Sequence, residues 1–139
     1  MNEKNCGGEV MEQFSLFIKQ FIEKQYRDKW LYLSEKGMDK VYKNISQLEK
    51  HLDKRYCHMD ETSTMQAVSA LLDKYKLDKG FYISFDDRDT SRNMKRSEWD
   101  TINSVEYIII YPKDDFALYF HHSGYVWVCD RKCQANDGG

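Results

Sequence analysis

The spacing of apolar residues changes at residue 81, and this change constrains the fold more than any other feature of the sequence. Before it, apolar residues recur every three or four positions, which is typical of amphipathic helices. After it, they alternate with polar residues or form short aromatic-rich runs between turn residues, which indicates strands. The order predicts an α+β fold, with helices first and a sheet second.

The first half of the chain predicts three helices. Residues 10–33 form one helix, or two joined near residue 26, and Gly37 supplies the left-handed residue that commonly ends a helix. Residues 38–52 carry one continuous apolar stripe and predict the second helix. The third begins at a cap among residues 60–63 and ends at Gly80.

The second half predicts four strands. They cover residues 81–86, 105–111, 116–120 and 125–129. The links PKDD and HHSG have hairpin length, so the last three strands form an antiparallel meander, which the first joins at an edge or across the sheet. We therefore expect three N-terminal helices packed on a four-stranded, mainly antiparallel sheet. Residues 9–133 would form a single domain between a flexible lead (1–8) and a flexible tail (134–139).

Composition excludes several classes of function. The 139 residues include 21 basic and 23 acidic side chains, so the net charge of −2 provides no basic field for direct nucleic-acid binding. No apolar stretch approaches the roughly 20 residues that span a bilayer. The N-terminus MNEKNCGGEV lacks the basic and apolar regions of a secretory signal, so we expect a cytoplasmic protein with no membrane contact. The four cysteines are irregularly spaced and are expected to be reduced.

The polar segment 86–104 offers a weak metal pattern. Asp87, Asp89, Ser91 and Glu98 have the spacing of a calcium-binding loop, but Arg92 occupies the position that requires glycine. The alternative is a solvated loop with a short helix that Ser97 caps, in which Trp99 packs against the sheet. No calcium site is predicted here.

Cysteines and histidines provide a second candidate for chemistry. They are the residue types of a zinc site or of a nucleophilic pair, namely Cys57, His58, His121, His122, Cys129 and Cys133. They lack the tight paired spacing of zinc ligands, so neither a metal nor another cofactor is predicted. A small-ligand-binding or metal-dependent enzyme with a Cys/His site or an Asp-loop site is the alternative function.

The function that the sequence favours is that of a non-enzymatic protein-binding module. Its acidic loops and aromatic strands suit an inhibitor or immunity-type protein that neutralises a nucleic-acid-handling enzyme, a protein partner with a basic surface. The strand residues Tyr107, Tyr119, Tyr125 and Trp127 either complete the core or face this partner. A homodimer is also open. The predicted partner-binding residues are Asp86, Asp87, Asp89, Trp99, Asp114, Asp115, Tyr125 and Trp127.

Overall fold

The fold is α+β, with one antiparallel sheet of six strands in the order β1-β6-β5-β4-β2-β3. The computed structural model describes residues 2–60, 65–86 and 90–131. Its strands are β1 (Cys57–Asp60), β2 (Lys79–Ser84), β3 (Arg92–Lys95), β4 (Tyr107–Tyr111), β5 (Phe116–Phe120) and β6 (Val126–Asp130). Its α-helices are α1 (Asn2–Phe21), α2 (Lys24–Lys36), α3 (Met38–Lys43) and α4 (Met65–Tyr75). Short 3-10 helices are η1 (Ile45–Gln47), η2 (Glu49–His51), η4 (Arg96–Thr101) and η5 (Pro112–Asp114).

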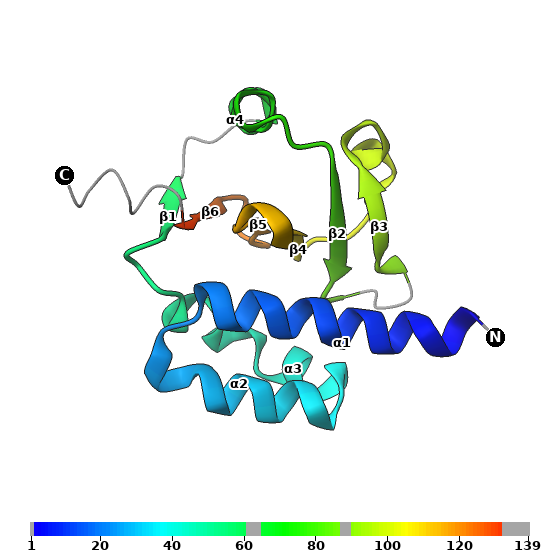
Figure 1. Ribbon diagram of the computed structural model, residues 1–139, viewed down its shortest axis with the longest axis vertical. Coiled ribbons are helices and arrows are strands. Elements are labelled where there is room, and N and C mark those ends of the chain that lie inside the picture. The colour runs from blue at the N-terminus through cyan, green and yellow to red at the C-terminus, as the bar shows by residue number, and fades with distance from the viewer. Residues whose placement is uncertain (1, 61–64, 87–89, 132–139) are drawn as a thin grey trace.

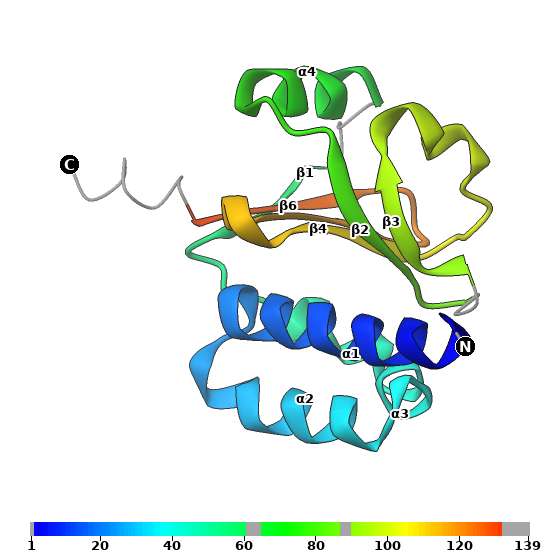
Figure 2. The same ribbon diagram turned by 45° about the vertical axis from the view of Figure 1, so that its right-hand side comes forward.

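Helices cover both faces of the sheet (Figure 1). Helix α1 lies across one face, and α2 and α3 form a further layer outside it, whereas α4 lies over the opposite face (Figure 2). Two cores follow from this arrangement, one between α1 and the sheet and one between α4, η4 and the sheet. The sequence of β4, YIIIY, is apolar on both faces, and each face packs into one of the two cores.

The predicted α+β class and the antiparallel meander β4-β5-β6 are confirmed, but the prediction of three helices on four strands is wrong in detail. The first helical stretch divides at Ile22, which forms an isolated bridge with Leu52, while the Glu23 N–H donates to the carbonyl of His51. The predicted helix 38–52 ends at Lys43 and continues as the 3-10 turns η1 and η2. The backbone contacts of Ile22 and Glu23 with residues 51 and 52 are incompatible with two uninterrupted helices, although the apolar stripe continues through both segments.

The two strands absent from the prediction are the edge strands. Within the part of the chain that the structure describes, β1 pairs with β6 alone and β3 pairs with β2 alone. In β3 only Met94 is buried, so the strand lacks the alternation that marks a strand in a sequence. Short, polar edges are the usual way to limit edge-to-edge association. The edge strands are therefore hard to predict, because the polar residues that limit association also remove the apolar alternation of a strand.

Two helix ends were predicted from glycines, and one of the two predictions is correct. Gly37 has a φ of 123° and caps the C-terminus of α2, as expected. Gly80, predicted to end the third helix, instead lies inside β2, and α4 ends earlier at Tyr75. An added Cβ at Gly80 would lie 2.7 Å from Cγ2 of Ile109, so the position is reserved for glycine by the packing of β2 on the side chains of β4.

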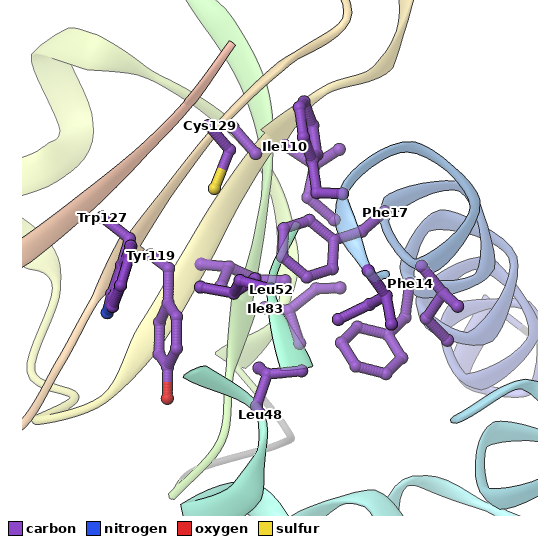
Figure 3. Packing of buried hydrophobic residues seen from close by; sticks show 14 of the residues in the cluster. Phe14, Phe17, Leu48, Leu52, Ile83, Ile110, Tyr119, Trp127 and Cys129 are labelled. Carbon is purple, nitrogen blue, oxygen red and sulfur yellow. The ribbon is translucent and has the colours of Figure 1, made fainter. Parts of the chain in front are cut away.

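The aromatic strand residues mostly complete the two cores. Tyr119 and Trp127 oppose each other on β5 and β6 and are buried on the α1 side, where Figure 3 shows Tyr119 between Trp127 and Leu52. Tyr107 and Phe120 stack at 4.6 Å between ring centroids on the α4 side. None of the helices in the described ranges has both the length and the apolar character of a membrane span.

Candidate functional site

Carboxylates and rings gather at the end of the sheet where β4 begins and β5 ends. They come from segments far apart in the sequence, and we call this group the sheet-end surface. Its residues are Tyr42, Glu49, Asp86, Val105, Glu106, His121, His122 and Tyr125. A cleft of about 370 Å³ opens beside them, toward α4.

Glu106 is the buried carboxylate of this surface. It precedes β4 on the same face as Ile108, in the α1-side core, and is only 7% exposed. The Tyr119 hydroxyl donates to its Oε2, and Nδ1 of His122 lies 2.6 Å from its Oε1. Burial, and then the hydrogen bond to Glu106, raise the pKa of Tyr119 well above its ordinary value. The tyrosine therefore stays neutral and keeps the proton that it donates.

Glu49 contacts three side chains that lie on strand β6 or in the turn between β5 and β6. Its Oε1 accepts hydrogen bonds from the Tyr125 hydroxyl at 2.7 Å and from Nε1 of Trp127 at 3.0 Å, and its Oε2 lies 3.1 Å from Nε2 of His121. The backbone N–H of Ser123 donates to Nδ1 of His121 at 3.0 Å. Nδ1 of His121 thus acts as an acceptor, which leaves Nε2 as the nitrogen that donates to Glu49.

The turn between β5 and β6 places both histidine rings together. The His121 N–H donates to the carbonyl of Tyr125, and the Gly124 N–H donates to that of His121, at 2.9 Å each. Gly124 has a φ of 98°, which favours glycine. The His121 ring stacks on Tyr125 at 4.5 Å and on His122 at 4.3 Å between centroids. The turn thus builds a stack of three rings beside the two carboxylates.

Asp86 orders the chain that enters β4. It accepts hydrogen bonds from the Ser104 hydroxyl, from Val105 N at 3.2 Å and from Glu106 N at 3.3 Å. Val105 is left 65% exposed on the rim of the cleft. Asp86 is thus both an exposed charge and the acceptor that fixes the backbone next to Glu106.

The cleft has aromatic walls. Tyr107 and Phe120 are among its lining residues, and burial raises the pKa of Tyr107 to about 12, so this ring carries a neutral hydroxyl. On the α1 side, Tyr42 of α3 is 40% exposed. Its pKa is raised by partial burial, and also by the negative charges of Asp86 and Glu106. The cleft therefore lies close to the carboxylates of Asp86 and Glu106, which contact its lining residues Val105 and His122.

The structure divides the predicted partner-binding residues among several places. Asp86 and Tyr125 lie in the sheet-end surface, and Trp127 adjoins it through Glu49. Trp99 packs edge-on against Phe120, behind the cleft. The Asp114–Asp115 turn lies at the opposite end of β4 and β5, where Asp115 accepts a hydrogen bond from Gln20. Asp87 and Asp89 lie outside the described residues.

The predicted cysteine and calcium candidates are placed elsewhere. Cys57 and Cys129 oppose each other on β1 and β6 as free, buried thiols, and burial raises the pKa of Cys129. Cys129 pairs with Ala117, several residues along β5 from the histidine turn, and His58 is exposed on β1. Cys133 lies outside the described residues.

The candidate calcium loop has two residues in the described range, and both have other partners. Ser91 is buried, and its hydroxyl accepts a hydrogen bond from Ser84 N. Glu98 accepts one from Lys95 N, which closes a capping box at the start of η4. The short helix predicted in this segment is present as η4, but it begins at Arg96 and Lys95 is its N-cap, where Ser97 was expected.

Sequence reasoning missed Glu49, Tyr42 and Val105, and it did not connect the histidines to Glu106. One signal was available, because Glu106 shares a strand face with Ile108 and Ile110, and a charge on an apolar face requires buried partners. Glu49 and Tyr42 gave no comparable signal, since each lies in a charged helical segment.

Comparisons with protein-family models, with curated proteins and with solved structures find no match for this chain.

Proposed function

We propose that this chain is a cytoplasmic, non-enzymatic protein-binding module, an inhibitor or immunity-type protein that neutralises a nucleic-acid-handling enzyme. The observation that carries the proposal is the clustering of three carboxylates, those of Glu49, Asp86 and Glu106, beside a cleft. The cleft is lined by the rings of Tyr107, Phe120, His121, His122 and Tyr125. Such a surface is complementary to a basic site built to bind phosphates. Negative charge steers a basic partner toward the surface, and the rings provide rigid contact area.

The exposed members of the surface suit an interface. Val105 and Tyr42 are two of the four large apolar side chains that stand out as exposed in the described ranges, and both lie next to carboxylates. A basic side chain of the partner, an arginine for example, could stack on the rings while its charge faces Asp86. The rest of the described aromatic strand surface is buried in the two cores, which favours the sheet end over the sheet faces as the docking surface.

The polar groups of the surface support binding in preference to catalysis. Glu49 accepts hydrogen bonds from Tyr125 and Trp127, and Glu106 accepts one from Tyr119, which is held neutral. Groups so engaged are preorganised to present charge, whereas a general base needs a lone pair within reach of a substrate proton.

The experiment is capture of the partner from a lysate of the native host with immobilised wild-type protein and two variants. Val105→Arg adds a positive charge to the sheet-end surface at an exposed position, and Tyr32→Arg makes the same kind of change on α2, where Tyr32 is also exposed. We expect a partner with a basic surface to bind the wild type and Tyr32→Arg. Val105→Arg should weaken binding roughly a hundredfold, because apposed like charges cost several kcal/mol.

The purified partner then permits a sharper test. Its affinity should fall as salt concentration rises, and its activity on nucleic acid should fall when the wild type is added but not when Val105→Arg is added at the same concentration. Equal binding by Val105→Arg and Tyr32→Arg, or a partner with no activity on nucleic acid, would refute the proposal.

A further inference from the structure

We propose that Glu106, His121 and His122 form a binding site for a zinc-type divalent ion. Each residue offers one ligand atom, and the three atoms all lie within 4.8 Å of one another. Two imidazole nitrogens and one carboxylate oxygen are a common three-ligand set for zinc, which leaves a fourth position for water or for another ligand. All three residues belong to the sheet-end surface, so the inference adds an ion to the surface proposed above for the partner. It does not rest on that proposal, because the experiment below measures zinc on the isolated protein.

Neighbouring histidines are usually poor joint ligands, because successive side chains of a strand point to opposite faces. Here the objection does not apply. The chain leaves β5 at Phe120, and the turn that follows brings both rings to the same side, tilted by 28° and stacked at 4.3 Å between centroids. Both histidines also line the cleft, so an ion has a route from solvent.

The surroundings of the three residues resemble the second layer of contacts at a metal site. A ligating histidine typically donates its other ring N–H to a carboxylate, as Nε2 of His121 does to Glu49 at 3.1 Å. Nδ1 of His121 keeps a lone pair, which at present accepts the Ser123 N–H. The Tyr119 hydroxyl holds Oε2 of Glu106, so that Oε1 faces His122. An ion would replace the proton shared between Glu106 and His122 and the hydrogen bond from Ser123.

The donor set selects the class of ion. Imidazole suits zinc, copper, nickel and iron, whereas calcium and magnesium take oxygen ligands almost exclusively. We therefore expect zinc to bind with one ion per chain and magnesium not to compete for it.

The experiment measures zinc binding to the isolated protein against a chromogenic chelator, together with the absorption spectrum of the cobalt form. His122→Ala is the main variant, because the His122 side chain is 59% exposed and its removal leaves the cores intact. His58→Ala is the matched control, since His58 is an exposed histidine on β1. Glu106→Gln is a second variant that keeps the size of the side chain and the acceptor for Tyr119.

We expect one equivalent of zinc on the wild type and on His58→Ala. His122→Ala and Glu106→Gln should each lose more than about a hundredfold in affinity, since loss of an outer partner alone costs about 10–100-fold. The cobalt spectrum should lack the intense near-ultraviolet band of thiolate ligation, which separates this site from the cysteines. Absence of stoichiometric zinc, unchanged affinity in His122→Ala, or a thiolate band on the bound cobalt would overturn the inference.

Discussion

At the scale of single residues, buried carboxylates are held by specific donors. Asp53 is paired with Arg55, Glu106 accepts from Tyr119, and Asp130 accepts from the Tyr75 hydroxyl at 2.7 Å. A buried charge without such donors would cost several kcal/mol, so these pairs fix how the segments meet. The Asp53–Arg55 pair is local in sequence, whereas the tyrosine donors come from distant segments, which is why a sequence pattern cannot predict them.

Asp53 provides a prediction for stability against pH. Arg55 donates to its two oxygens from Nε at 3.0 Å and from Nη2 at 2.8 Å, and these hydrogen bonds lower the pKa of Asp53 below its ordinary value of 3.8. The unfolded state then binds the proton more tightly, so the stabilisation is fully present above pH 3.8 and is lost as pH falls through the lowered pKa. Asp53→Asn should reduce the free energy of unfolding by about 1–3 kcal/mol at neutral pH.

Urea unfolding of wild type and variant at several pH values checks this. The difference between them should shrink as the solution is acidified below pH 3.8. Asp73→Asn is the control, because Asp73 pairs with Arg96 but is 66% exposed, and such surface pairs contribute less than about 1 kcal/mol. A difference for Asp53→Asn that stays constant with pH would contradict the assignment.

At the scale of elements, the strands with two neighbours were predictable and the edges were not. Strands β4, β5 and β6 are apolar because two cores cover them, and their turns have hairpin length, so β5 matches its predicted bounds and β4 and β6 match within a few residues. Among the described residues, β1 and β3 each have one neighbouring strand. His58 and Met59 of β1 are exposed, as are three of the four residues of β3, so these polar sequences resemble loops. Gly80 was misplaced because a glycine after a helical stripe has the same appearance as a helix end.

Gly80 gives a prediction about the packing of β2 on β4. A Cβ at this position would lie 2.7 Å from Ile109 Cγ2 and 2.9 Å from the Tyr111 ring, and both side chains are buried. Gly80→Ala should therefore lower the free energy of unfolding by roughly 1–3 kcal/mol, the usual cost of overpacking a core. Lys79→Ala, in the same strand at an exposed position, should change it little. Thermal and urea unfolding measure the stability of both variants. A neutral or stabilising Gly80→Ala would contradict this account, because it would show that β2 and β4 move apart at little cost.

At the scale of the whole molecule, the sheet-end surface joins the helical half of the chain to the strand half. Tyr42 and Glu49 come from the helices, Asp86 follows β2, and the histidines follow β5. The sequence predicted acidic and aromatic partner-binding residues, and two of them, Asp86 and Tyr125, lie in this surface. It could not show that Asp114 and Asp115 lie at the other end of the sheet, because that depends on which ends of β4 and β5 meet the helices.

The central claim is that partner binding takes place at the sheet-end surface, and mapping the contact on the protein tests it most directly. Amide chemical shifts of the isotope-labelled protein would be followed while the captured partner is added. We predict that the signals of residues 104–106 and 121–125 shift or broaden first, while those of residues 113–115, at the opposite end of β4 and β5, stay unchanged. Perturbation of residues 113–115 with an unaffected sheet end would contradict the account.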